Sequence, residues 1–225
     1  MTIPEPYKSI VEKNYQTLIS KGLSDNSLTE YFNVCFDDTI RHFKAYDCWV
    51  CVHCLSEGKL SWGWGDKPNN CPECGQVVYK VATFQLRASI TGDAFEWAFY
   101  KLLNAYYNLP LVRVSAYTHD FEVGNNVAIN CKGSAGEVPN PDGSRVILGR
   151  PGMIRSDTYK KAFGDAKNFR KQRPNWRFYI VTNAMPDNLI GYKNRDIDGI
   201  YDVTKLNQLE RLIDEIRQNL KGTLI

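Results

Sequence analysis

Four polar residues interrupt segments that are otherwise patterned for burial, namely Glu96, Asp120, Asn130 and Lys132. Carboxylates are hard oxygen ligands for a divalent cation such as Mg²⁺, and an ammonium group beside the cation helps to generate and orient an attacking hydroxide. If the fold gathers these residues, their combined chemistry suits hydrolysis of a phosphodiester. The cation would offset the negative charge that accumulates as the phosphate is attacked.

A helix is predicted to carry Glu96. From Gly92 onward, apolar residues recur at spacings of three and four, which buries one helix face and leaves Glu96 on its flank. We expect Thr91 or Asp93 to cap this helix. The residues of the buried face are Phe95, Ala98, Phe99, Leu102 and Leu103.

A hairpin is predicted to carry the other three residues. Residues 124–126, Gly-Asn-Asn, have the chemistry of a tight turn between two strands. Alternation puts Asp120 and Glu122 on one face of the first strand, and Asn130 and Lys132 on one face of the second. Pairing of the two strands would bring three of these side chains together, beside the carboxylate of the preceding helix.

This series of motifs resembles that of the PD-(D/E)XK, or restriction-endonuclease-like, nucleases. In that family a helix carries G-x-x-F-E, the next strand carries an Asp, and a strand after a short turn reads apolar–carboxylate–apolar–Lys. The resemblance covers about residues 92–183, less than half of the chain. It implies an α/β fold with a mixed β-sheet flanked by helices, and a Mg²⁺-dependent endonuclease, of restriction type, acting on double-stranded DNA.

By the same resemblance, Asp120 would be the central Mg²⁺ ligand and Lys132 the residue that activates water. Glu96 would act on the cation through water or support the direct ligands. Many such enzymes are homodimers that cut both strands, so a homodimer is expected. The alternative is that Glu96 and Lys132 are solvated edges of an ordinary α/β domain and that Asp120 only closes a turn.

Position 130 departs from the family pattern, which has Asp or Glu two residues before the lysine. Asn130 can offer its oxygen to Mg²⁺, but the missing unit charge is worth roughly 4 kcal/mol at 4 Å and an effective dielectric constant near 20. Three explanations remain open: an acid was replaced and the enzyme is inactivated, the natural enzyme works with an amide, or the protein binds DNA without cutting it. Glu122 could instead supply the missing charge.

Four cysteines predict a metal site. Cys51, Cys54, Cys71 and Cys74 form C-x2-C-x16-C-x2-C, the spacing of a zinc ribbon. Four thiolates close a tetrahedral Zn²⁺ site, which would be structural because no position is left for a substrate. Cys48 is an alternative to Cys54 as the partner of Cys51. A protein that uses the ribbon to join another protein is a further alternative function.

Two features are candidates for contacts with nucleic acid. Trp62 and Trp64 share a strand face between the cysteine pairs, where they could stack on bases or pack against the rest of the protein. A helix predicted over residues 156–172 has a basic side that could contact phosphates or remain solvated. Its candidate residues are Lys160, Lys161, Lys167, Arg170 and Lys171.

The remaining segments complete an α/β domain. Residues 133–153 are rich in Gly and Pro and predict a long surface loop with a short strand at 146–148. The aromatic and β-branched residues 176–184 predict a buried strand beside the Lys132 strand. Apolar spacing predicts further helices over about residues 4–21, 27–43 and 206–220. The second of these is expected to begin near Asn26 or Ser27, with Glu30 in a capping box.

The composition suits one domain with a small insertion: 225 residues, 43% of them hydrophobic. The expected division is a helical segment over 1–46, the ribbon over 47–82 and the nuclease domain over 83–225. A net charge of +3 is too small to indicate a nucleic-acid-binding protein by itself. We find no signal-peptide pattern and no membrane-spanning run, and therefore expect a cytoplasmic protein without membrane contacts. The resemblance implies a prokaryotic or phage-encoded protein.

Overall fold

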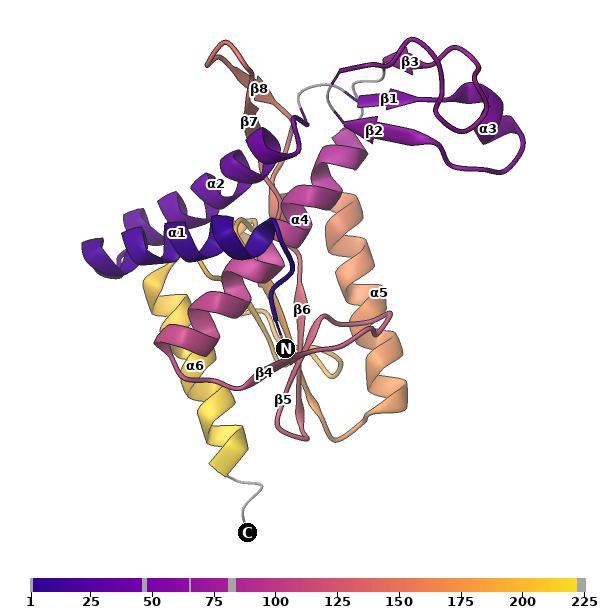
Figure 1. The fold of residues 1–225 in the computed structure, drawn as a ribbon. Helices are drawn as coiled ribbons and strands as arrows, with labels where there is room; N and C mark the ends of the chain where they lie inside the picture. The colour runs from indigo at the N-terminus through magenta and orange to yellow at the C-terminus, as the bar shows by residue number, and fades with distance from the viewer. Residues whose placement is uncertain (1, 46–47, 65, 81–83, 222–225) are drawn as a thin grey trace.

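A mixed five-stranded sheet forms the centre of the molecule (Figure 1). The structure is a computed structural model that describes residues 2–45, 48–64, 66–80 and 84–221. The order across the sheet is β10 (Gly199–Asp202), β9 (Arg177–Thr182), β6 (Val127–Cys131), β5 (Phe121–Val123) and β4 (Leu111–Arg113). The first three run parallel to one another, whereas β5 and β4 are antiparallel to their neighbours. The expected mixed sheet is therefore confirmed, including the pairing of β9 with β6.

Strand β6 is covered on both of its faces. All five of its residues are buried, because it lies in the middle of the sheet with helices above and below. Val127, Ile129 and Cys131 belong to the larger core cluster, whereas Ala128 belongs to the smaller cluster on the opposite face. The predicted alternation of the two faces is correct, but the face with Asn130 is as deeply buried as the other.

Helices α1 (Tyr7–Lys21), α2 (Asp25–His42), α4 (Phe84–Lys101) and α6 (Leu206–Lys221) contribute to the larger core cluster. A short π-helix, Leu102–Tyr106, continues α4. The rings of Phe32 and Phe95 lie 5.0 Å apart between α2 and α4, and Tyr31 donates a hydrogen bond to the carbonyl of Ala98. The N-terminal helices thus share one core with the sheet.

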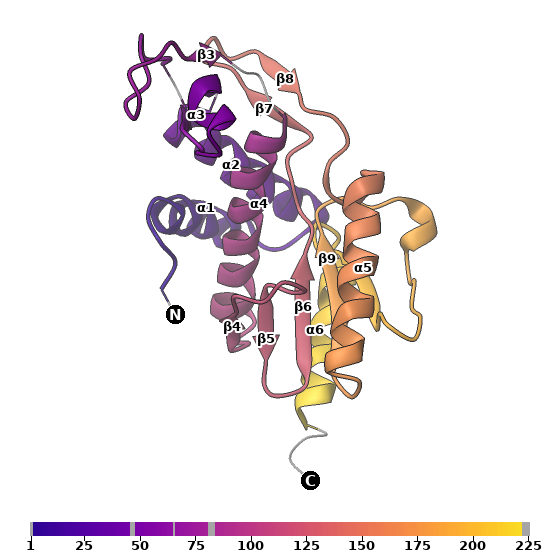
Figure 2. The ribbon, with the colours of Figure 1, turned by 90° about the vertical axis from the view of Figure 1, so that its right-hand side faces the viewer.

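Helix α5 (Ser156–Gln172) covers the opposite face of the sheet (Figure 2). Ala162, Ala166 and Phe169 pack on Phe178 and Ile180 in the smaller core cluster. Two short 3-10 helices, Gly152–Ile154 and Asp187–Leu189, flank this layer. The chain passes from β6 through α5 to the parallel strand β9, which is a β-α-β connection.

Two predicted helix starts are wrong. Helix α4 begins at Phe84, so Thr91 and Asp93 lie inside it and do not cap it. Thr91 donates a hydrogen bond to the carbonyl of Arg87, one turn earlier. Helix α2 is capped by Ser24, two or three residues before the expected start, and its capping box is formed with Ser27 and not with Glu30, because the Ser24 and Ser27 side chains exchange hydrogen bonds with each other's backbone N–H.

The predicted long loop contains a two-stranded hairpin. Strands β7 (Glu137–Pro139) and β8 (Arg145–Ile147) pair antiparallel. Arg145 at the start of β8 makes two hydrogen bonds to the carboxylate of Asp37 on α2, at 2.9 and 3.1 Å. The hairpin is therefore fastened to the helical layer.

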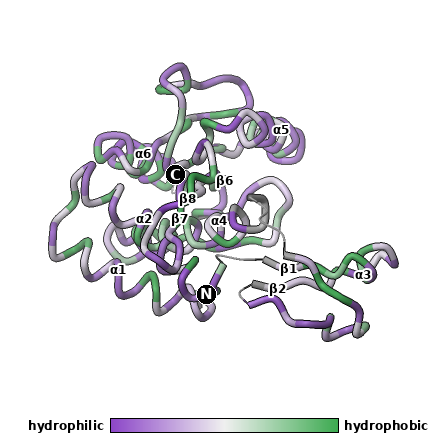
Figure 3. Tube along the Cα trace, turned by 90° about the horizontal axis from the view of Figure 1, so that it is seen from above, coloured by the Kyte–Doolittle hydropathy of each residue, from purple (hydrophilic) through white to green (hydrophobic). Residues whose placement is uncertain are grey.

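The ribbon projects from one end of the body, as two perpendicular views show (Figures 1 and 3). Its sheet has the order β2 (Trp62–Trp64), β1 (Cys48–Val50) and β3 (Tyr79–Lys80), and a short helix, α3 (Val52–Ser56), follows β1. Its small core contains Trp49, Val78 and the cysteines. Within the described ranges, no helix combines the length and the apolar character needed to pass through a lipid bilayer.

Candidate active site and four-cysteine metal centre

An open cleft lies where β6 ends, between α4 and the beginning of α5, and its volume is about 370 Å³. Glu96, Asp120, Lys132 and Lys161 of the predicted site residues line it, and Asn130 does not. Figure 2 shows how the two helices stand on either side of the end of β6. The structure therefore brings together three of the four residues that the sequence singled out for catalysis.

Asp120 lies immediately before β5 and is fixed from both sides. Its carboxylate accepts a hydrogen bond from the backbone N–H of Cys131 at 2.6 Å. Its own N–H donates to the carbonyl of Ile129 at 3.0 Å. These bonds hold the carboxylate against the end of β6, beside Lys132.

Glu96 enters the cleft from α4 and pairs with an arginine. Nη2 of Arg113 lies 2.7 Å from Oε2 of Glu96. The guanidinium also lies over the ring of Trp97, 4.5 Å from the ring centre, which fixes its position. Burial and the nearby Asp120 raise the pKa of Glu96 to about 7, although Arg113 acts in the opposite direction.

A third carboxylate, that of Asp93, lines the cleft and was not predicted as a site residue. It precedes Glu96 by three residues, so both project from the same side of α4. The hydroxyl of Tyr7 on α1 donates a hydrogen bond to it at 3.3 Å. The i, i+3 spacing could have revealed this residue, but its type suggested a helix cap.

Three half-buried carboxylates in one cleft suit a divalent cation. Burial raises the pKa of Asp93 and of Asp120 above the usual value, and it also raises that of Glu96. The negative charges further repel one another, because Asp120 raises the pKa of both Asp93 and Glu96. A hard cation would relieve both costs, and carboxylate oxygens are the ligands that Mg²⁺ prefers. The residues present therefore fit the ion.

Protein without a divalent ion in the cleft should lose stability as the pH rises from about 4.5 to about 7. Because Glu96 has a higher pKa in the folded state than its ordinary 4.5, the folded protein holds the proton more tightly. This stabilising effect is complete below pH 4.5 and is lost as the pH passes about 7. In thermal unfolding, Glu96→Gln should remove on the order of 2 kcal/mol of this pH dependence. If the stability of Glu96→Gln depended on pH as steeply as that of the parent protein, the expectation would be wrong.

Lys132 follows β6 directly and its backbone is held by β9. Its N–H donates to the carbonyl of Val181 at 2.8 Å, and its carbonyl accepts from the hydroxyl of Thr182 at 2.9 Å. The ammonium lies 3.3 Å from a carboxylate oxygen of Asp165 on α5. Lys132 thus has a fixed backbone and an acidic partner on the side away from α4.

The residue after Lys132 sets the distance between α4 and the strand. A β-carbon at Gly133 would lie 2.1 to 2.4 Å from ring carbons of Phe95, which is far below any permitted contact. Phe95 is fully buried, so its ring could make room for a β-carbon only if α4 moved with it. Only glycine allows Glu96, the neighbour of Phe95, to approach this closely.

Asn130 is completely buried beneath Lys132. Its amide nitrogen donates to the carbonyl of Thr118 at 2.8 Å and to the carboxylate of Asp165 at 3.1 Å. Its own oxygen has no hydrogen-bond partner among the described residues. Glu122 does not replace the missing acid, because its carboxylate lies 3.1 Å from the ring of His119 and lines a different cavity.

Asn130→Asp should destabilise the protein by about 2–4 kcal/mol. A carboxylate at this position would face the carbonyl of Thr118 and the carboxylate of Asp165, and it has no proton to donate to either. Urea unfolding measures the loss. Asn168→Asp, an exposed change on α5, is the control and should be nearly neutral. If Asn130→Asp were as stable as the parent, the amide would not be needed here.

The basic residues of α5 divide into three groups. Lys161 lines the cleft together with Arg155. Lys160, Lys167 and Lys171 are exposed at spacings of seven and four, which places them on one side of the helix. In contrast, the Arg170 guanidinium is directed into the protein, where it pairs with Asp198 at 2.8 Å and with backbone carbonyls.

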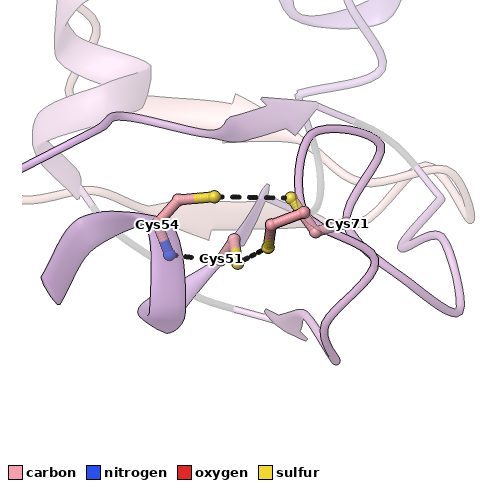
Figure 4. Close-up of side chains that lie close together, drawn as sticks. Cys51, Cys54 and Cys71 are labelled. Carbon is pink, nitrogen blue, oxygen red and sulfur yellow. Dashed lines mark hydrogen bonds between the residues drawn. The ribbon is translucent and has the colours of Figure 1, made fainter. Parts of the chain in front are cut away.

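The four cysteines of the ribbon form a compact group. The sulfur atoms of Cys51, Cys54, Cys71 and Cys74 all lie within 4.8 Å of one another, and Figure 4 shows three of them converging from α3 and the second turn. This set matches the predicted pairing and could hold a metal ion such as zinc. The side chain of Cys48 lies outside the described residues.

Local hydrogen bonds shape the two cysteine turns. Cys51 caps α3, and its sulfur accepts a hydrogen bond from the N–H of Cys54. In the second turn, the N–H of Gly75 donates to the carbonyl of Cys71, and Gly75 has a φ of 73°. Desolvation acts to raise the pKa of Cys71, but hydrogen bonds from Ser61 and two backbone amides lower it to about 6. The lowered pKa of Cys71 favours the thiolate that a metal requires. In contrast, the pKa of Cys54 is raised, chiefly by its hydrogen bond with the Cys74 sulfur and by desolvation, and that of Cys74 is also raised.

Of the two candidate stacking residues, the structure describes the side chain of Trp62 alone. Trp62 is half-buried in β2 opposite Val50, while the side chain of Trp64 lies outside the described residues. Between them, Gly63 lies under the indole of Trp49, which leaves no space for a β-carbon. The ring that packs inside the ribbon is therefore that of Trp49.

Comparison of the chain with protein-family models, with curated proteins and with solved structures finds no match. The function of the cleft must therefore be argued from its own chemistry. That chemistry consists of three half-buried carboxylates on α4 and just before β5, Lys132 directly after β6, and an exposed acid, Asp157, paired with Arg155 near Lys161 at the start of α5.

Proposed function

We propose that the protein is a Mg²⁺-dependent endonuclease that hydrolyses phosphodiester bonds of double-stranded DNA, of restriction type. The observation that carries the proposal is the cleft in which Asp93, Glu96 and Asp120, all with raised pKa values, face Lys132. Such a cleft attracts a cation on one side and offers an ammonium group to the substrate on the other. The resemblance of the motifs to the PD-(D/E)XK nucleases supports the same reaction.

Asp120, Glu96 and Asp93 would hold Mg²⁺, and Asn130 would not, because its side chain is turned away from the cleft. When bound, the ion would offset negative charge on the attacked phosphate. Lys132 would orient the attacking water and stabilise the hydroxide that results. Lys161, in the second turn of α5, would hold a phosphate oxygen of the DNA backbone, and so would Arg155, which would exchange its ion pair with Asp157 for the phosphate.

The four-cysteine site is proposed to hold a structural Zn²⁺, which would order the ribbon and orient Trp62 toward the DNA. A homodimer would let two clefts cut both strands. We propose that this reaction takes place in the cytoplasm of a prokaryotic cell, where the gene belongs to the cell or to a phage.

A second candidate function is binding of DNA without cleavage. It is favoured by the amide at position 130 and by the contact of Arg113 with Glu96, because a guanidinium on this carboxylate competes with a metal ion. In that case the exposed lysines of α5 and the ribbon would carry the whole function.

The two functions are distinguished by incubating the protein with supercoiled plasmid and with genomic DNA from several sources, with and without Mg²⁺. We expect nicked and linear products only with Mg²⁺, and Lys132→Met should cleave at least about a hundredfold more slowly. If the protein shifts DNA in a gel but leaves it intact under every condition, the binding function replaces the nuclease.

The exposed lysines of α5 should contribute to affinity and not to the chemical step. Replacing Lys160, Lys167 and Lys171 with alanine should reduce the slope of log affinity against log salt concentration by about 3, since each lysine neutralises one phosphate. Fluorescence anisotropy with duplex DNA measures the slope. The matched control replaces Lys8, Lys13 and Lys21 of α1 with alanine, and an equal change there would show that the effect is not specific to α5.

A further inference from the structure

We propose that Asp165 is the positioning residue for Lys132 and that it supplies, from α5, the negative charge that position 130 lacks. This inference rests on the proposed nuclease function for its catalytic meaning. Its structural part stands on the contacts among Asp165, Asn130 and Lys132. In this arrangement, the amide of Asn130 is the donor that fixes Asp165, and it takes no part in holding a metal.

One carboxylate oxygen links the three residues. Oδ2 of Asp165 lies 3.3 Å from the ammonium of Lys132 and 3.1 Å from the amide nitrogen of Asn130. The Asp165 side chain is 5% exposed and that of Lys132 is 14% exposed. Because water has little access, the ion pair is stronger than a surface pair and the ammonium has few other positions.

The surroundings of Asn130 require an amide. Its nitrogen contacts two acceptors, the carbonyl of Thr118 and the carboxylate of Asp165. A carboxylate at position 130 would satisfy neither, and it would place a second negative charge beside the first. With asparagine, one acid remains in the interior, and its position is determined by the amide on one side and the ammonium on the other.

The sequence of β6 and α5 explains why Asp165 can reach this place. Ala162 and Ala166 are fully buried against the sheet, so small side chains let α5 lie close to β6. Asp165 lies on the same side of the helix, one turn after Lys161, which lines the cleft. The helix that borders the cleft therefore also holds the lysine inside it.

Three variants test the arrangement: Asp165→Asn, Asn130→Asp, and both changes together. The double variant exchanges the amide and the carboxylate and restores one acid beside Lys132. Asp214→Asn, an exposed change on α6, is the control. For each protein we would record the ¹⁵N signal of the Lys132 ammonium, assigned with Lys132→Arg, and measure the rate of DNA cleavage and the affinity for DNA.

The ammonium signal should be slow to exchange with water in the parent and should be lost in Asp165→Asn. The maximal cleavage rate should fall by about 10- to 100-fold while the affinity for DNA changes by less than about threefold, because the lysine is displaced and not removed. In the double variant the ammonium signal should return and the rate should recover by about tenfold. If Asp165 had only a structural role, exchanging the amide and the carboxylate would not restore the ammonium signal and the cleavage rate.

If Asp165→Asn does not fold, the proposal can still be tested on the parent protein. A hydrogen-bond coupling between the ammonium nitrogen of Lys132 and the carboxyl carbon of Asp165 is expected, and its absence would overturn the proposal. An unchanged ammonium signal in folded Asp165→Asn would also overturn it. If no protein cleaves DNA, the nuclease function fails, whereas the NMR results still confirm or refute the role of Asp165.

Discussion

Asp120→Asn should slow Mg²⁺-dependent cleavage of DNA by at least about a thousandfold. A unit charge is worth roughly 4 kcal/mol at 4 Å and an effective dielectric constant near 20, and more against a divalent ion. A loss of that size corresponds to about three powers of ten in rate. The amide oxygen of the new side chain can still accept the hydrogen bond from Cys131, so the fold should be preserved. Single-turnover cleavage of labelled duplex DNA measures the effect.

The matched control for this variant is Glu122→Gln. Glu122 is two residues away and pairs with His119 in a separate cavity, so its loss should change the cleavage rate by less than about threefold. Both variants should bind DNA like the parent when Ca²⁺ replaces Mg²⁺. If Glu122→Gln were the inactive protein and Asp120→Asn the active one, the site would lie around His119, and the cleft would have been misassigned.

Cys71→Ser should abolish binding of the ribbon metal and unfold the ribbon alone. Among the described ribbon residues, Trp49 and Val78 are the ones that form its buried core together with the cysteines. A structural Zn²⁺ contributes on the order of 10 kcal/mol to the folding of such a small unit. Among the residues whose side chains the structure describes, the two core clusters of the body contain none between Ala45 and Ile90. Amides of residues 48–80 should therefore lose protection from hydrogen exchange, while strands β6 and β9 keep theirs.

Cys48→Ser is the control for the metal site. Cys48 precedes Cys51 at ligand spacing, yet the group formed by Cys51, Cys54, Cys71 and Cys74 is complete without it. Elemental analysis should find about one zinc per chain in the parent and in Cys48→Ser, and very little in Cys71→Ser. A zinc-free Cys48→Ser together with a zinc-loaded Cys54→Ser would mean that the first pair is Cys48 and Cys51.

Local sequence patterns predicted many of the helices and strands of this fold. Helix α5 has the expected bounds, and the strands and turn of the β5–β6 hairpin follow from the alternation around residues 124–126. The four ribbon cysteines were identified by spacing, because each metal knuckle is a local structure. Local patterns did not show how the N-terminal helices attach to the sheet domain, since the packing of Phe32 on Phe95 joins residues far apart in the sequence.

The parts of the site that sequence could not predict depend on how layers pack. Asp165 looks like any acid on a basic helix, and its role follows only from the register of α5 against β6. Asp93 was interpreted as a possible cap because of its residue type and because the helix was expected to begin at Gly92. Ser89, Thr91 and Gly92 are weak helix formers, but Ile90 and Ala94 are buried in the main core, so the helix continues through the whole segment.

Gly133 has no reactive side chain, yet its size sets the width of the cleft. Since even one methyl group there would press on the ring of Phe95, each added atom acts as a spacer that separates the carboxylates of α4 from the lysine of β6. Replacing Gly133 with alanine, serine or valine would widen this gap in steps without replacing any charged residue. The decline of a reaction along such a series would measure how much of its rate depends on spacing alone.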